Sequence, residues 1–171
     1  MIETESDLSS KRVIHDTKAS EMGDESATFN LGNMYNNGRG VPKDEKKAVE
    51  LYTKASEMGD ASATFNLGVM YDNGIGVPKD EKKAVELYAK ASEMGDATAT
   101  CKLGLMYENG TGVPKDEKKA VELFTKASEM GNASATCNLG YMYANGTGVP
   151  KDKKKAEDLY TKAAEMGYHI A

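Results

Sequence analysis

The sequence predicts an all-α protein, a solenoid of stacked helix–loop–helix repeats. The first observation is a string, Leu-Gly-x-Met-Tyr-x-Asn-Gly-x-Gly-Val-Pro-Lys-Asp, that begins at Leu31, Leu67, Leu103 and Leu139, always 36 residues apart. The second is that every unit holds two helix-forming runs separated by a loop rich in glycine and proline. A fixed period of this length is typical of repeat architectures, in which neighbouring units bury a shared core.

The repeat divides the whole chain. We expect a flexible N-terminal arm at 1–7 and a tail at 169–171. Residues 8–24 match the second half of a unit, which predicts an N-terminal half-repeat that caps the stack. Four full repeats follow, the last acting as a C-terminal cap, and they span 25–60, 61–96, 97–132 and 133–168.

The second repeat shows how each unit is read. Asp60 is expected to cap a first helix over about 61–73, helix A. The loop 74–78 cannot be helical, because its glycines allow positive φ and its proline lacks a backbone N–H. Asp80 then caps a second helix, helix B, which runs to about Met94.

Each helix carries one apolar stripe, and neither helix could bury its stripe alone. Gly68 lies in the middle of helix A, where glycine costs about 1 kcal/mol relative to alanine, so we expect a close helix approach there. The stripes consist of Ala63, Leu67, Gly68 and Tyr71 on helix A and of Ala84, Leu87, Tyr88, Ala91 and Met94 on helix B.

The amino-acid composition argues against several classes of function. The net charge of −5 argues against nucleic acid as a partner, and no apolar run is long enough for a membrane helix. The only histidines, His15 and His169, lie in the end segments, so we expect no metal site and no histidine-based catalytic triad. Nearly every other polar group recurs in each repeat. We therefore expect no cofactor and no enzymatic activity.

The cysteines and the N-terminal sequence indicate in which cellular compartment the protein is located. Cys101 and Cys137 are one repeat apart, and stacked helices place equivalent positions about 8–10 Å from each other. A disulfide needs a shorter Cα separation, so free thiols and the cytoplasm are predicted. The acidic N-terminus has no apolar stretch of a secretory signal, although a signal removed earlier would leave secretion open.

The repeat resembles a known family. Phe65-x-Leu67-Gly68-x-x-Tyr71, followed by Ala84-x-x-x-Tyr88-x-x-Ala91, resembles the tetratricopeptide pattern. The longer unit and its glycine loop resemble the Sel-one-like repeat (SLR) relatives of that family. The resemblance implies a right-handed superhelix whose A helices line a concave face, and an adaptor role in protein complexes.

Some cysteine-rich members of that family are described as penicillin-binding or β-lactamase-like. In that branch a disulfide bridges the two helices of each repeat. This chain departs from the branch, because two repeats contain no cysteine and the other two contain one each. The departure argues against a lactam-hydrolysing activity.

Five of the positions of helix A that differ between the repeats lie on one face, opposite the apolar stripe. Two of them hold four different residues, at 33/69/105/141 and 36/72/108/144. We interpret this varied face as a surface for a protein or peptide partner of unknown identity. The alternative is that an exposed face drifted in sequence after the repeats were duplicated. For the position 29/65/101/137, the alternative is ordinary packing between repeats. A consensus-like array without any ligand is the alternative for the whole chain.

One asparagine per repeat, at 37, 73, 109 and 145, precedes the loop glycine. It could bind a peptide backbone, or it could be favoured there only as a helix-end residue. The candidate binding residues are Asn33, Asn36, Asn37, Val69, Asp72, Asn73, Lys102, Leu105, Glu108, Asn109, Asn138, Tyr141 and Asn145.

Both ends of the stack are expected to be polar caps, which predicts a monomer. Glu157 takes the place of a valine found in the other repeats. Arg12, His15 and Asp16 stand where full repeats have Ala, Leu and an aromatic residue that pack on their own helix A.

Overall fold

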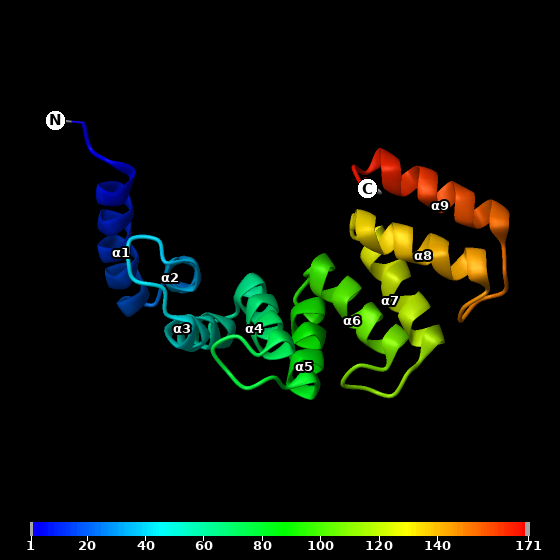
Figure 1. The fold of residues 1–171 in the computed structure, drawn as a ribbon, viewed down its shortest axis with the longest axis horizontal. Coiled ribbons are helices and arrows are strands. Elements are labelled where there is room, and N and C mark those ends of the chain that lie inside the picture. The colour runs from blue at the N-terminus through cyan, green and yellow to red at the C-terminus, as the bar shows by residue number, and fades with distance from the viewer. Residues whose placement is uncertain (1, 170–171) are drawn as a thin grey trace. The chain divides into compact units, whose positions relative to one another are not determined.

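The computed structural model describes residues 2–169, which form nine α-helices and no strand (Figure 1). The predicted all-α helix–loop–helix repeat is confirmed. Within this part of the chain, no helix combines the length and the apolar character that crossing a membrane requires. The helices are α1 Glu5–Glu21, α2 Glu25–Asn37, α3 Glu45–Glu57, α4 Ala61–Asn73, α5 Glu81–Glu93, α6 Ala97–Asn109, α7 Glu117–Glu129, α8 Ala133–Asn145 and α9 Lys153–Glu165.

The helix ends follow from local capping. Asp60 precedes α4, and its side chain accepts a hydrogen bond from the Ala63 N–H at 2.7 Å. Gly74 ends the same helix with φ at 66°, in the left-handed region, and its N–H donates to the carbonyl of Met70. The bounds predicted for helix A of this repeat are therefore confirmed. The even-numbered helices are A helices and the odd-numbered ones are B helices.

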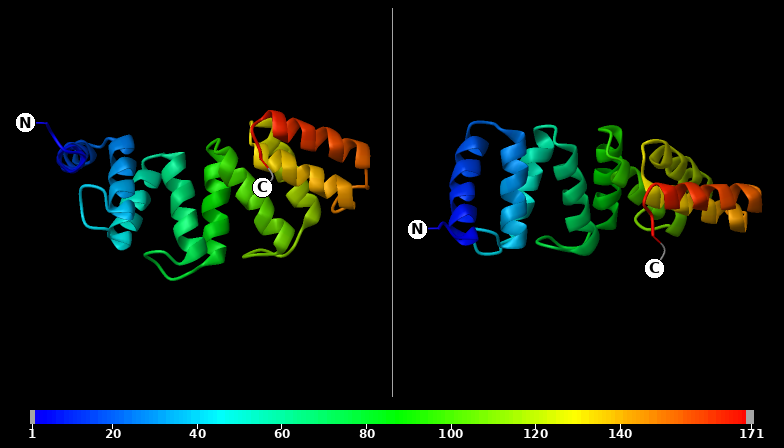
Figure 2. Two further views of the ribbon diagram at one scale, coloured as in Figure 1. Left: turned by 45° about the horizontal axis from the view of Figure 1, so that its top comes forward. Right: turned by 90° about the horizontal axis from the view of Figure 1, so that it is seen from above.

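The chain divides into two compact units, 1–87 and 88–171, and the boundary lies within α5. In the first unit, each of α1 to α3 packs against the next helix along the chain (Figure 2). Its core gathers around Tyr52, Leu67 and Met70. In the second unit, α6 to α9 pack in the same sequential way, and Phe124 and Met142 are central to the core.

Glycines in the middle of the A helices allow the close approach that the sequence predicts. A Cβ atom on Gly32 would lie 2.7 Å from the Tyr52 ring, and one on Gly104 would lie 2.7 Å from the Phe124 ring. Both rings are almost fully buried. A methyl group at either glycine would therefore displace the largest core side chain of its repeat.

Consecutive repeats meet at a loop glycine. A Cβ atom on Gly148 would lie 2.5 Å from the Glu117 carbonyl oxygen and 3.1 Å from Val121, both in the B helix of the preceding repeat. This contact explains why Val121 is buried. Glu157, at the equivalent position of α9, is exposed.

A second contact between repeats joins two hydroxyl groups that the sequence analysis does not single out. A serine near the end of each of the B helices α1, α3, α5 and α7 is hydrogen-bonded to a fully buried threonine of the next A helix. The pairs are Ser20–Thr28 at 2.7 Å and Ser56–Thr64, Ser92–Thr100 and Ser128–Thr136 at 2.6 Å.

Two expectations for the N-terminal segment are wrong. The flexible arm was expected to extend to residue 7, but α1 begins at Glu5, because Thr4 and Asp7 form a capping box. Asp16, expected to be part of a polar cap, is only 3% exposed. Its carboxylate lies 3.5 Å from Arg12 Nε and 3.1 Å from His15 Nδ1, which provide it with polar partners.

Candidate functional site

The varied face is present on the A helices of both units. All 13 predicted residues are at least partly exposed, but they contribute unequally. The most accessible are Asn37, Asn73, Lys102, Asn109, Tyr141 and Asn145. The half-buried ones are Asn33, Asn36, Val69, Asp72, Leu105, Glu108 and Asn138. That the face lines a concave groove stays a prediction.

Part of the varied face is structural. The side-chain oxygen of Asn33 accepts a 2.6 Å hydrogen bond from the Tyr52 hydroxyl, which ties α2 to α3. Leu105, expected to be exposed, is half-buried and packs against the core of the second unit. These contacts limit how far either side chain can adapt to a partner.

The position at 29/65/101/137 is a packing position in the repeats where its contacts are seen. Phe29 lies against Tyr52 with ring centroids 5.9 Å apart. Cys101 is 5% exposed, and its sulfur accepts a hydrogen bond from the Asn138 amide at 3.7 Å. Burial raises the pKa of the Cys101 thiol, which keeps it in the unreactive protonated form. Cys101 and Cys137 are both free cysteines.

The helix-end asparagines have a local role. The amide nitrogens of Asn73, Asn109 and Asn145 each donate to the carbonyl oxygen four residues earlier in their own helix, at 2.9, 3.0 and 2.9 Å. This bond satisfies a carbonyl group that the helix end would leave without a partner. The interpretation as helix-end residues therefore accounts for these three without a ligand.

In the second unit the varied face combines charge with an exposed ring. Tyr141 is 53% exposed, which is unusual for an aromatic side chain in the middle of a helix. Lys102 is exposed, whereas Glu108 is half-buried. Burial and the nearby Glu117 carboxylate raise the pKa of Glu108, and the nearby Lys115 ammonium group partly opposes this effect.

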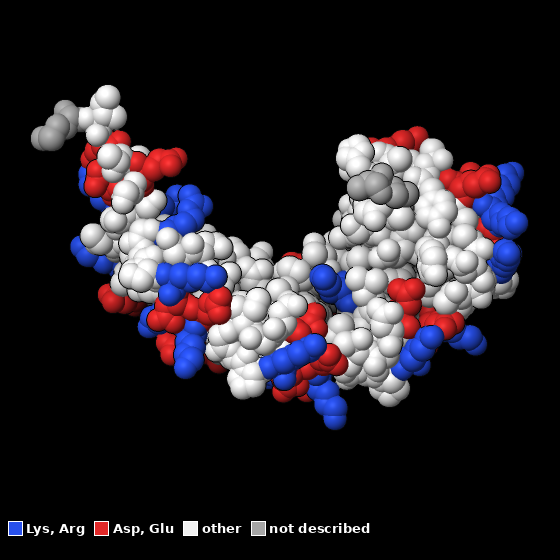
Figure 3. All heavy atoms as spheres, viewed as in Figure 1, with Lys and Arg blue, Asp and Glu red and all other residues white. Residues whose placement is uncertain are grey.

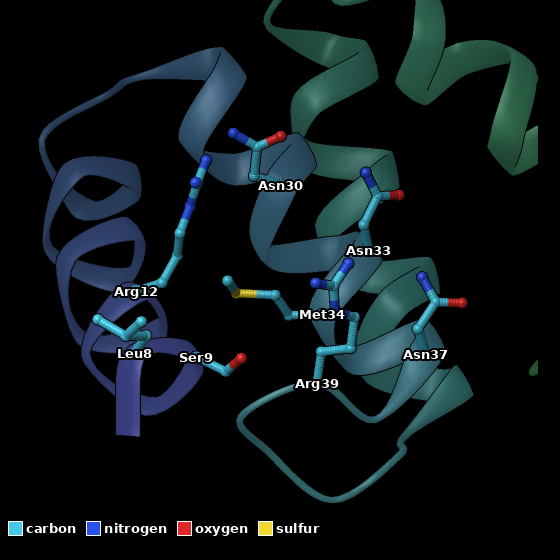
Figure 4. A pocket seen from close by; sticks show the side chains of 8 residues that line it. All are labelled: Leu8, Ser9, Arg12, Asn30, Asn33, Met34, Asn37 and Arg39. Carbon is cyan, nitrogen blue, oxygen red and sulfur yellow. The ribbon is translucent and has the colours of Figure 1, made fainter. Parts of the chain in front are cut away.

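A pocket of about 340 Å³ opens where α1 meets α2 in the first unit. Two of the predicted residues, Asn33 and Asn37, line it, whereas the rest of the pocket was not predicted. Figure 4 shows Arg12 extending from α1 and Arg39 from the loop after α2, on either side of Met34. The full lining is Leu8, Ser9, Arg12, Asn30, Asn33, Met34, Asn37 and Arg39.

Other charged groups do not form a site. Acidic and basic side chains are interspersed on the visible face of the molecule (Figure 3). Within α3, Lys47 and Glu50 form an ion pair at 3.5 Å. Exposed pairs of this kind contribute little to stability and are typical of a solvated helix face. Across residues 2–169, no three His, Cys, Asp or Glu side chains are grouped so that they could hold a metal ion.

Fold and surface together define an α-helical repeat protein whose helix pairs keep one face for packing and vary the other. The profile of the Sel1 repeat matches residues 25–60, 61–96, 97–132 and 133–168. The chain belongs to the Sel1 repeat family, as its resemblance to the SLR family predicts. Proteins of this family generally act as scaffolds for protein–protein interaction and are typically non-catalytic.

Three solved structures are similar over most of the chain. A protective antigen of uropathogenic Escherichia coli with an SLR fold is 34% identical, with a TM-score of 0.87, over 91% of this chain and 33% of its own. A Sel1 repeat protein from Oxalobacter formigenes is 37% identical, with a TM-score of 0.87, over 90% of this chain and 63% of its own. Cysteine rich protein B of Helicobacter pylori is 30% identical, with a TM-score of 0.62, over 77% of this chain and 95% of its own.

The chain thus spans only 33% and 63% of the first two of these proteins. Comparison with curated protein sequences gives no match.

Proposed function

We propose that the chain is a non-catalytic scaffold that binds a protein or peptide through the varied face of its A helices. The observation that carries the proposal is the contrast between the two faces of these helices. One face repeats because it is buried, whereas the position 33/69/105/141 holds four different residues on the accessible side. Tyr141 is the strongest single candidate, because exposed tyrosines are frequent energetic centres of protein interfaces.

Drift after duplication would also vary an exposed face, but it gives no reason for Tyr141 to be an exposed ring. A polar side chain would avoid exposing apolar surface to water. Lys102 and the half-buried Glu108 add charge to the same face of the second unit, which would favour some partners over others.

The proposal is tested by site-specific photo-cross-linking in the native cell. A photoreactive amino acid replaces Tyr141, and a matched variant carries it in place of Glu122, which is exposed on α7. We expect a discrete cross-linked protein from position 141 that position 122 does not give. Identical products from both positions, or none from position 141, would contradict the proposal and favour an array without a ligand.

The captured partner then allows a quantitative test. Tyr141→Ala should weaken its binding about tenfold or more, because removing a central aromatic side chain typically costs at least 1–2 kcal/mol. Glu122→Ala should leave the affinity unchanged. Circular dichroism of both variants should match the unmodified protein, since neither side chain is buried.

A further inference from the structure

We propose that the pocket between α1 and α2 binds a carboxylate group carried by a peptide or protein. The inference rests on the proposed function and deepens it, because it assigns a chemistry to the partner at one defined place. Asn30 and Asn33 belong both to this pocket and to the varied face, and the helix-end Asn37 also lines the pocket. The pocket therefore continues that surface at the first unit.

The pocket gathers the chain's arginines. Arg12 and Arg39 are the only two arginines among its 22 basic residues, and both line this pocket. The positions equivalent to Arg39 hold Ile75, Thr111 and Thr147, so the pair occurs once. All lysines except Lys102 and Lys153 recur at equivalent positions of the repeats, as expected of solvated helix faces, whereas this pair departs from the repeat pattern.

The two guanidinium groups are available to a ligand. Arg12 contacts Asp16 through Nε at 3.5 Å, and its side chain is 62% exposed. That contact does not involve the terminal nitrogens of Arg12, a residue that lines the pocket. Arg39 is exposed, and none of the ion pairs among residues 2–169 involves it. Planar guanidinium groups bind carboxylates with two parallel hydrogen bonds, which makes arginine better suited to this task than lysine.

The local charge favours a group with one negative charge. The two guanidinium groups are the charged groups of the pocket lining, and the buried Asp16 carboxylate, which lies outside the lining, offsets the charge of Arg12. A carboxylate matches the remaining charge of Arg39, whereas a phosphate dianion would leave an excess beside Asp16.

The rest of the lining suits an acidic side chain and the peptide that carries it. Asn30, Asn33 and Asn37 follow one another on one face of α2 and supply amide groups. The oxygen of Asn33 is already bound to the Tyr52 hydroxyl, so its amide nitrogen is the part left to donate. Leu8 and Met34 provide apolar surface for the methylene groups of the ligand.

The test uses short peptides as probes and the full chain labelled with nitrogen-15. N-acetyl-Gly-Gly-Glu-Gly-Gly-amide presents a side-chain carboxylate, and N-acetyl-Gly-Gly-Gly-Gly with a free C-terminus presents a terminal one. The neutral control is N-acetyl-Gly-Gly-Gln-Gly-Gly-amide, in which Gln replaces the Glu of the first peptide. The readout is the shift of the Arg Nε–H and Asn side-chain amide signals in NMR spectra.

We expect at least one carboxylate peptide to shift the signals of Arg12, Arg39 and the pocket asparagines, with saturation, while the neutral peptide does not. The peptide that binds more tightly identifies the source of the carboxylate. Equal shifts with the neutral peptide, no saturable shift with either acid, or tighter binding of inorganic phosphate would each overturn the proposal.

Arg39→Gln is the variant of choice, because Arg39 is exposed in a loop and its loss should not disturb folding. It should weaken carboxylate binding about tenfold or more, since a charge-assisted bidentate contact is lost. Lys43→Gln is the matched control. Lys43 is an exposed cation of the same loop that pairs with Glu45 and does not line the pocket. Equal weakening by both variants would show a diffuse charge effect instead of a site.

The peptide titration and the cross-linking experiment test the two proposals separately, so one proposal can be contradicted while the other stands. Loss of the cross-link at position 141 with intact carboxylate binding would contradict the proposed function of the varied face alone. A second combination would contradict only the proposed carboxylate site. In it, position 141 gives a cross-linked partner whose affinity is unaffected by Arg39→Gln, and neither carboxylate peptide binds.

Discussion

Gly76 lies where the loop of one repeat touches the B helix of the repeat before it. Its φ is 71°, and a Cβ atom there would lie 2.6 Å from the carbonyl oxygen of Glu45. Gly40 and Gly148 make the same kind of contact in their own repeats. The second glycine of the loop motif is therefore explained by two independent constraints, a left-handed backbone and a neighbouring main chain.

Gly76→Ala should lower the free energy of unfolding by more than about 2 kcal/mol, because backbone strain and a clash with Glu45 add together. Gly59→Ala is the control, since Gly59 has φ at 102° but its Cβ would meet only the Glu25 carboxylate, at 3.8 Å. That change should cost about 1–2 kcal/mol from strain alone. Urea unfolding followed by circular dichroism measures both, and equal losses would rule out the clash.

Between elements, the buried serine–threonine pair joins each B helix to the next A helix. The Thr136 hydroxyl donates to the Asn132 carbonyl at 3.1 Å, so it can accept the bond from Ser128. Both hydroxyls are buried, at 6% and 0% exposure. A fixed polar contact of this kind sets the register between helices, because a shifted arrangement would leave both hydroxyls without partners.

Thr136→Val keeps the shape of the side chain but leaves the buried Ser128 hydroxyl without its acceptor, so it should cost about 1–2 kcal/mol of unfolding free energy. The double variant Ser128→Ala/Thr136→Val removes both partners and should cost less than the two single changes added together. Strict additivity in thermal or urea unfolding would show that the hydrogen bond does not couple the two helices.

Over the whole molecule, burial is uneven along the chain. The helices α3, α5, α6 and α7 each have six buried residues, whereas α1 and α9 each have two. In a repeat protein each helix pair is stabilised chiefly by its neighbours, so helices with less buried surface open more easily.

Amide hydrogen exchange should therefore be slowest in α3, α5, α6 and α7 and fastest in α1 and α9. The exchange rates differ because an amide exchanges when its helix opens locally, and the opening of α1 or α9 exposes little buried surface. Exchange measured by NMR or mass spectrometry at neutral pH tests this. Uniform protection across all the described helices would mean that the repeats unfold only together.

The sequence by itself determined the repeat, the helix boundaries within the full repeats and the buried stripe. Caps such as Asp60, loop glycines and the helical period act within a few residues of the chain, so their effects are readable from local order. The varied face was also readable, because internal repeats supply their own comparison.

Only the tertiary structure decided which residues of that face are free. Leu105 is half-buried and Asn33 is bound by Tyr52, because each meets side chains that are close in space and not in sequence. Asp16 is buried for the same reason, and Arg12 and Arg39 come together only because α1 packs against α2. Such contacts depend on the packing of separate helices, which local propensity does not encode.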